Sequence, residues 1–352
     1  MDKVGVGLIG AGMMGSWGHY PGYAEIPDKA KMVAVCDKEP SALNDLAERS
    51  GAKPYTDYQE LLKDPKVDAV DICLPHFLHG RVALAALEAG KHVIVEKPFT
   101  MTLSEADQVI AAAKRTGLKL MVAENMRFVN AYEVTKALVE KGEIGDICYA
   151  RAYTGGPNGP LDPENWRSKP EEAGGGTMMD DGVHCFDMFR WMVGDVKSVF
   201  AITNRFNKDS SKTVEDNAVG TVRFKNGAMG IYAFSTTTMS PWTEQLELYG
   251  TEGAIIVDFL SHQPVRVLSA KRAINEVDEQ WSQYGNIAWQ EPFIEHSVER
   301  WATLAMRKEV KYFVDCILEN TEPRVTGEDG KKAVELVLKA YESAKLGKEV
   351  EI

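Results

Sequence analysis

Short apolar runs alternate with amphipathic segments through the first third of the chain. The apolar runs VGVGLI, KMVAVC, VDAVDICLP, KHVIVEK and LKLMVAE have the length of strands. Residues 41–50, 79–89 and 104–116 carry the spacing of helices between them. This alternation predicts an α/β domain over residues 1–125, built on a doubly wound parallel sheet whose ligands bind beyond the carboxyl ends of the strands.

The pattern changes at about residue 145. The runs DICYARAYTGG, VKSVFAITNRF, NAVGTVRFKNG, AMGIYAFSTTT and EQLELYGTEGAIIVD are strand-like and are separated by Gly, Asn and Asp turns. Consecutive strands of this kind predict an α+β domain over residues 126–352 with a large, mainly antiparallel sheet. Two amphipathic helices follow, over 296–320 and 327–347, and the C-terminal one can pack on either domain.

A glycine motif closes the first apolar run. Gly10, Gly12 and Gly15 have the GxGxxG spacing of a Rossmann dinucleotide-binding turn. Asp37 ends the next strand, about 20 residues further on, where a carboxylate binds the adenosine ribose. We therefore expect NAD, with NADP as an alternative because Lys38 reduces the repulsion of a 2′-phosphate. Asp37 as a strand-end acid or a helix cap is the competing interpretation.

Length, charge and cysteine usage narrow the class of protein. A chain of 352 residues is long enough for two domains. Its formal charge of −12, without a basic cluster, argues against nucleic acid as a partner. The five cysteines form no CxxC pair, so we expect neither a disulfide framework nor a metal site. No apolar run is long enough for a membrane span, and no signal peptide is recognised, so we expect a cytoplasmic protein.

Three polar residues carry the candidate chemistry. Lys97 directly follows a buried strand, at the ligand-binding edge of the predicted sheet. Asp180 and His184 follow a run of three glycines and, four residues apart, share one face of a helix. The competing interpretations are that Lys97 is a surface lysine and that His184 is a core histidine. Asp181, which follows Asp180, can likewise be only a first-turn acid that complements the helix dipole.

Several stretches together resemble the glucose-fructose oxidoreductase, inositol dehydrogenase and rhizopine-catabolism (Gfo/Idh/MocA) family. They are the GxGxxG turn, LPHFLHGRVALAALEAGKHVIVEKP, GEIGDI, NWR, GGGTMMDDGVHCFDMFRWMVG and GTEGAIIVD, and they extend over nearly the whole chain. The resemblance implies a nicotinamide-dependent oxidoreductase in which Lys97, Asp180 and His184 are the catalytic residues. The imidazole of His184, with an ordinary pKa near 6.5, suits proton transfer to and from a substrate hydroxyl.

The expected site has a cofactor side and a substrate side. The cofactor-binding candidates are Gly10, Gly12, Met13, Met14, Gly15, Asp37, Lys38, Leu74, Pro75, His79, Glu96 and Lys97. The substrate-binding candidates are Lys97, Asn125, Arg127, Trp166, Arg167, Asp180 and His184, with packing as the alternative for Trp166. His76 departs from the smaller polar residue usual in the family, and Glu124 and segment 274–293 receive no role.

The resulting hypothesis is a dehydrogenase that oxidises a secondary alcohol of a sugar, a sugar derivative or a cyclitol. Two alternatives stay open: a redox-neutral glycosidase- or lyase-type enzyme that holds NAD tightly, and a non-enzymatic sensor of sugar and dinucleotide. The family resemblance also implies a homodimer or homotetramer formed through the C-terminal sheet.

Overall fold

The structure is a computed structural model that describes residues 3–157, 165–207, 213–259, 264–269 and 297–352. Segment 274–293 lies outside the described residues. The chain divides into two compact units. The first contains residues 1–125 and 302–334, and the second contains residues 126–301 and 335–352.

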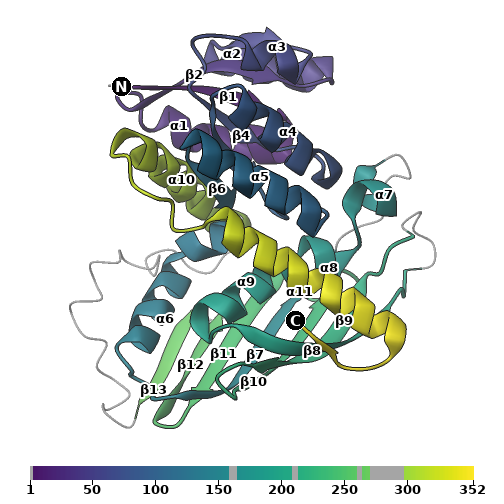
Figure 1. Ribbon diagram of the computed structural model, residues 1–352. Helices are drawn as coiled ribbons and strands as arrows, with labels where there is room; N and C mark the ends of the chain where they lie inside the picture. The colour runs from purple at the N-terminus through teal and green to yellow at the C-terminus, as the bar shows by residue number, and fades with distance from the viewer. Residues whose placement is uncertain (1–2, 158–164, 208–212, 260–263, 270–296) are drawn as a thin grey trace. The chain divides into compact units, whose positions relative to one another are not determined.

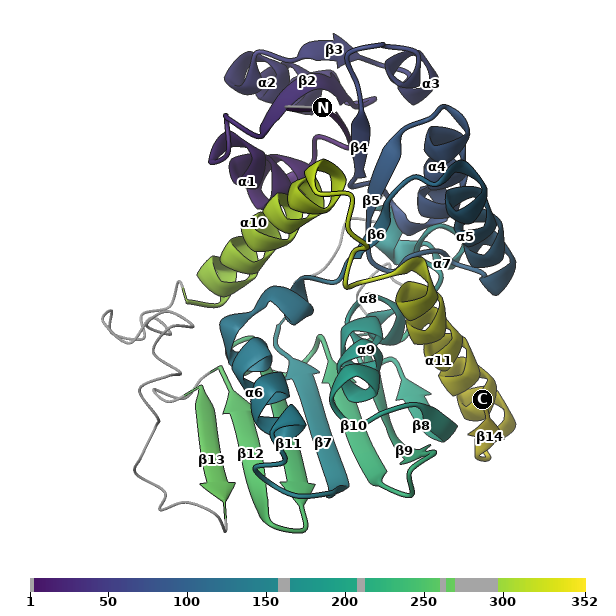
Figure 2. The same cartoon turned by 60° about the vertical axis from the view of Figure 1, so that its left-hand side comes forward.

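The first unit is built on a six-stranded parallel sheet with the strand order β3-β2-β1-β4-β5-β6 (Figure 2). Its strands are β1 Val4–Ile9, β2 Ala30–Cys36, β3 Lys53–Tyr55, β4 Ala69–Ile72, β5 His92–Glu96 and β6 Leu120–Ala123. The central strands β1 and β4 are buried at every position, as the continuous apolar runs predict for a sheet covered on both faces. The expected doubly wound sheet is confirmed.

Helices connect these strands. They are the π-helix η1 Met14–His19, α1 Tyr20–Ala24, α2 Pro40–Ser50, α3 Tyr58–Leu62, α4 His76–Glu88 and α5 Leu103–Thr116. Helix α4 begins three residues before the predicted start, because the extended backbone of Pro75 already forms its N-cap. Helix α10, Ser297–Leu318, also belongs largely to this unit. Gly22 lies against the backbone of Arg307 on that helix, where a Cβ atom would be 2.9 Å from its Cα.

The second unit is built on an eight-stranded sheet with the order β13-β12-β11-β7-β10-β9-β8-β14. Its strands are β7 Ile147–Gly155, β8 Val196–Asn204, β9 Asn217–Phe224, β10 Met229–Ser235, β11 Thr243–Gly250, β12 Gly253–Asp258, β13 Val265–Ser269 and β14 Val350–Glu351. The sheet is antiparallel except between β7 and β10, which pair in parallel. The predicted mainly antiparallel sheet is therefore confirmed, with a central parallel pair that the turn pattern does not reveal.

In both views, α6 Asn130–Glu140, α8 Thr177–Asp180 and α9 Gly182–Met192 lie over one face of this sheet (Figures 1 and 2). The other helices in this part of the chain are η2 Asn125–Phe128, η3 Trp166–Ser168, α7 Pro170–Ala173 and α11 Gly327–Leu346, whose residues up to 334 belong to the first unit. The aromatic rings of Phe186 and Phe189 on α9 pack edge-on against Tyr232 and Phe224 of the sheet. This packing fixes the helix that carries His184. No helix among the described residues is both long and apolar enough to cross a membrane.

Candidate active site

The glycine turn between β1 and η1 has the geometry of a dinucleotide-binding turn. Gly10 adopts a φ of +104°, and a Cβ atom there would be 2.1 Å from the carbonyl oxygen of Cys73. A Cβ at Gly15 would be 2.1 Å from the carbonyl oxygen of Gly10. A Cβ at Gly12, in contrast, would meet no protein atom within 4 Å. The first and third glycines thus allow the turn and the packing, and the second leaves space for a pyrophosphate.

Asp37 holds this turn from the end of β2. Its Oδ2 atom accepts a hydrogen bond of 2.7 Å from the amide of Ala11, and its Oδ1 atom accepts one of 2.9 Å from the amide of Glu39. Each carboxylate oxygen can accept a second hydrogen bond, so both can bind ribose hydroxyls. The adjacent Lys38 is exposed, as are Gly12 and Met13, and Met14 is half-buried. These residues fit NAD.

The loops after β4 and β5 carry the remaining cofactor-side candidates. Leu74 and Pro75 are half-buried, whereas His79 is fully buried on α4. The ring nitrogens of His79 lie 2.7 Å from the carbonyl oxygens of Leu74 and Pro98, so this histidine joins the two loops. Burial lowers its pKa, although both hydrogen bonds act in the opposite direction. A direct contact between His79 and a cofactor stays a prediction.

Lys97 directly follows β5 and is half-buried. The preceding residue, Glu96, is buried, and its Oε2 atom accepts a hydrogen bond of 3.0 Å from the Lys97 amide. The Oε1 atom of Glu96 lies 3.1 Å from Nε2 of His19. These contacts of Glu96 are to the protein, and its contact with a cofactor stays a prediction.

The glycine run before α8 has a different environment. A Cβ at Gly176 would be 1.7 Å from the carbonyl oxygen of Glu215, and one at Gly175 would be 2.0 Å from the Tyr341 hydroxyl oxygen. The Glu215 carboxylate accepts hydrogen bonds from the amides of Gly176 and Met178 at 3.0 Å. The Tyr341 hydroxyl donates a further bond of 2.7 Å to it. Glu215 and Tyr341 therefore hold the segment that leads to Asp180 and His184.

Asp180 ends α8, and His184 lies in the first turn of α9; both side chains are half-buried. Nε of Arg167 lies 3.2 Å from Oδ2 of Asp180, and the guanidinium stacks 4.3 Å from the centre of the Trp166 ring. Trp166, Arg167 and Asp180 thus form one group in the second unit. Their proposed contacts with a substrate stay predictions.

Arg127 and Asn125 are buried. Arg127 donates two hydrogen bonds of 2.6 Å to Asp187 on α9, a bidentate ion pair with both side chains almost inaccessible. The observed partner favours a role for Arg127 in anchoring α9, and a substrate contact stays a prediction. The Oδ1 atom of Asn125 is buried and has no hydrogen-bond partner among the described residues.

Sequence reasoning missed the supporting residues of both units: His19, Asp71, Glu215, Tyr341 and Asp187. One of them had a visible signal, because Asp71 is an acid inside the apolar run VDAVDICLP. An ionisable residue in a buried strand needs a partner, which the structure identifies as His19. Glu215 and Tyr341 carry no such signal, since they are 126 residues apart in the sequence.

Together, the Rossmann sheet, the open glycine turn and the carboxylate of Asp37 fit a dinucleotide-dependent oxidoreductase. Comparison with known proteins specifies the family. Residues 4–124 match the oxidoreductase family with an NAD-binding Rossmann fold, and residues 132–256 match the GFO/IDH/MocA C-terminal domain. The chain belongs to the GFO/IDH/MocA family, and NAD is its cofactor. The expected family, dehydrogenase class and cofactor are confirmed.

Several similar proteins are named for the compounds on which they act. The myo-inositol 2-dehydrogenase of Thermotoga maritima is 30% identical, over 96% of this chain and 95% of its own length. The levoglucosan dehydrogenase of Pseudarthrobacter phenanthrenivorans is 31% identical, over 77% of each chain. A solved structure of levoglucosan dehydrogenase with NADH and levoglucosan superposes with a TM-score of 0.88 and 26% identity, covering 100% of both chains.

Proposed function

We propose that this dehydrogenase oxidises a secondary alcohol of a sugar, a sugar derivative or a cyclitol, with His184 as the proton acceptor. The observation that carries the proposal is the open dinucleotide turn at Gly12 with the carboxylate of Asp37, in a chain whose relatives include enzymes named for myo-inositol and levoglucosan. Asp37 favours NAD over NADP, because its carboxylate accepts from a 2′-hydroxyl and repels a 2′-phosphate.

The three catalytic candidates have separate tasks in this proposal. NAD supplies the acceptor for the hydride. His184 takes the hydroxyl proton as the hydride leaves the same carbon, and it returns the proton in the reverse reaction. Lys97 donates a hydrogen bond to the reacting oxygen and stabilises its developing negative charge. Asp180 accepts from a substrate hydroxyl while Arg167 keeps its carboxylate oriented.

Two further observations support a polyol substrate. The buried Oδ1 atom of Asn125 lacks a hydrogen-bond partner among the described residues, so a substrate hydroxyl is a suitable donor for it. The Trp166 ring offers an apolar surface on which a sugar ring stacks, and Arg167 fixes its orientation. The redox-neutral enzyme and the sensor are not favoured, because the relatives named above are dehydrogenases.

We also propose a cytoplasmic homo-oligomer that associates through the second unit's sheet. Ile202, Val219, Met229 and Ile231 are exposed on neighbouring strands, and the strand register places Ile202 opposite Val219. Apolar side chains in adjacent positions of an exposed sheet face are typical of a protein interface. Light scattering should give at least twice the chain mass of 38.9 kDa, and a monomer would contradict this part of the proposal.

The test is the formation of NADH, followed by absorbance, with NAD or NADP and a panel of cyclitols, anhydrosugars, aldoses and sugar acids. Replacing His184 with alanine should lower kcat by about 10² to 10⁴ because the positioned base is lost. NAD affinity, measured by quenching of tryptophan fluorescence, should change little. The matched control is His92→Ala, a histidine at the amino end of β5. Unchanged kcat in His184→Ala would reject His184 as the proton acceptor.

Sustained NADH formation would also separate the main proposal from its redox-neutral alternative. That alternative predicts altered sugars by mass spectrometry without accumulation of NADH. A protein that binds NAD but changes no compound of the panel would instead favour the sensor.

A further inference from the structure

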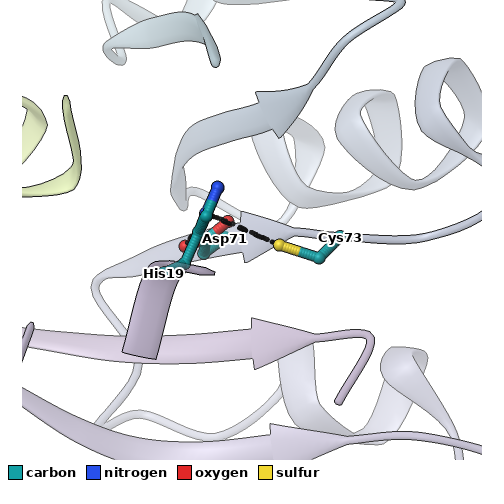
Figure 3. A group of neighbouring side chains, drawn as sticks. All are labelled: His19, Asp71 and Cys73. Carbon is teal, nitrogen blue, oxygen red and sulfur yellow. Dashed lines mark hydrogen bonds and ion pairs between the residues drawn. The ribbon is translucent and has the colours of Figure 1, made fainter. Parts of the chain in front are cut away.

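The first unit contains a buried group of ionisable side chains beneath the cofactor-side loops. His19 ends the π-helix η1, Asp71 lies in β4, and Cys73 follows that strand (Figure 3). Nδ1 of His19 lies 2.8 Å from Oδ2 of Asp71, while Nε2 lies 3.1 Å from Oε1 of Glu96. Both carboxylate groups and the imidazole are buried. One histidine thus bridges the acids of two neighbouring strands.

The two hydrogen bonds of His19 require a proton on each of its ring nitrogens. Two carboxylates face the two nitrogens, and an imidazolium donates one hydrogen bond to each. Burial favours the neutral ring, but Asp71, with a further contribution from Cys73, raises the pKa of His19 well above its ordinary value. Burial likewise raises the pKa of Glu96, but the hydrogen bond and charge of His19 outweigh it and lower that pKa. The imidazolium therefore has a carboxylate partner at each of its two ring nitrogens.

Two further groups complete the surroundings of the imidazole. The Tyr23 hydroxyl donates a hydrogen bond of 2.9 Å to Oδ2 of Asp71. Glu309 of α10 is fully buried, its Oε1 atom is 3.7 Å from Nε2 of His19, and neither of its carboxyl oxygens has a hydrogen-bond partner among the described residues. Burial raises the pKa of Glu309 well above its ordinary value, although the charge of His19 acts in the opposite direction. Glu96, Glu124 and Asp71 are the acids nearest to Glu309.

His19, Asp71 and Cys73 also have the residue types of metal ligands, and their atoms lie within 4.8 Å of one another. The distances favour a proton. Tetrahedral zinc with bonds of about 2.0–2.1 Å to nitrogen and oxygen holds those ligands about 3.3 Å apart. The 2.8 Å between Nδ1 and Oδ2 is instead the length of a charge-assisted hydrogen bond. Burial also raises the pKa of the Cys73 thiol, which opposes the thiolate that a metal needs.

The network leads directly to the proposed catalytic lysine. Glu96 accepts from His19 with Oε1 and from the Lys97 amide with Oε2. We propose that the buried imidazolium of His19 is a positioning residue: with Asp71 it fixes Glu96, and Glu96 fixes the backbone from which Lys97 projects. This inference rests on the role of Lys97 proposed above.

The first test measures the positioning itself. Hydrogen exchange at the Lys97 amide, followed by mass spectrometry of the free enzyme, should accelerate at least tenfold in Glu96→Gln and in His19→Gln. His92→Gln, on the same strand but outside the network, should leave it unchanged. Equal protection of this amide in Glu96→Gln and the unmodified protein would overturn the proposal. Tyr23→Phe, which keeps the imidazole and removes one bond to Asp71, should have a smaller effect and guards against a His19 variant that fails to fold.

A spectroscopic measurement identifies the cation. In protein labelled with ¹⁵N-histidine, one imidazole should keep both ring protons at pH 8, and that signal should be absent from His19→Gln. A neutral His19 would refute the imidazolium. Tight stoichiometric zinc that is lost in Cys73→Ala would also refute it, in favour of a metal site.

A double-mutant cycle then tests whether the network acts through Lys97. Glu96→Gln alone should lower kcat by about 10-fold to 100-fold, as expected for a catalytic group misplaced by about 1 Å. In a Lys97→Ala background, Glu96→Gln should lower kcat little further, because the Lys97 side chain that Glu96 positions is already absent. If the double variant instead loses kcat by the product of the two single losses, Glu96 acts independently of Lys97, and the positioning role is overturned. Unchanged kcat in Lys97→Ala would instead reject the proposed role of Lys97 and leave the exchange result to decide the positioning.

Discussion

The two units each contain a glycine turn held by a carboxylate, and the two turns use their glycines differently. In the first unit, Asp37 accepts from the amide of Ala11, and the side of the turn at Gly12 is open. In the second, Glu215 accepts from the amide of Gly176, and the space beside this glycine is filled by Glu215 itself. A glycine can thus admit a ligand or admit the protein's own backbone. Only the surroundings distinguish the two.

The second turn should be the more sensitive to an added methyl group. A Cβ at Gly176 would lie 1.7 Å from a backbone oxygen, which cannot move aside as a flexible side chain could. We expect Gly176→Ala to lower the free energy of unfolding by about 3 kcal/mol, the upper range for an overpacked site. Urea denaturation measures the loss. If Gly176→Ala is as stable as the unmodified protein, the turn has space for a Cβ atom, which contradicts the observed packing.

The same substitution in the first turn should affect binding more than stability. A Cβ at Gly12 meets no protein atom, so Gly12→Ala should change the free energy of unfolding by less than about 0.5 kcal/mol. It should raise the Kd for NAD about tenfold, or about 1.4 kcal/mol, because the methyl group occupies space needed by the pyrophosphate. Fluorescence titration with NAD provides the measurement. Unaltered NAD affinity would contradict the assignment of Gly12 to the cofactor.

The contrast also explains how much could be predicted from the sequence. The Rossmann sheet could be predicted because its signals are local: buried strands are continuous apolar runs, and Asp37 follows the glycines at the distance typical of the fold. The glycine run at 174–176 could be recognised as a close approach of the backbone, but its partner could not. Glu215 and Tyr341 reach it from β9's preceding loop and from α11, a tertiary arrangement that leaves no periodic pattern.

The supporting network of Lys97 shows the same limit. Lys97 was identified from its place after β5, which is a local property of the chain. His19 lies 77 residues before Glu96, and its π-helical position at the end of η1 has no signature in the amphipathic pattern. Candidate residues at strand ends are therefore easier to recognise in a sequence than the buried residues that contact their backbone.

The smallest expected effect concerns the charge of Glu215. Burial raises its pKa above the ordinary 4.5, and this effect exceeds the opposing effect of the bonds from Tyr341, Met178 and Gly176. A raised pKa in the folded state means that the folded protein binds this proton more tightly than the unfolded chain does. The associated stability is fully present below about pH 4.5 and is lost as the pH rises through the folded-state pKa.

Glu215→Gln removes that titration and keeps an acceptor oxygen for the glycine turn. The unmodified protein should therefore have its greatest advantage over this variant at low pH, and the difference in the free energy of unfolding should shrink as the pH rises above about 4.5. Urea denaturation of both proteins across this range tests the slope. If the difference in the free energy of unfolding instead grows with pH, the hydrogen bonds to Glu215, rather than its burial, control its charge. The carboxylate of the second turn would then act like that of the first turn, mainly as an acceptor of hydrogen bonds.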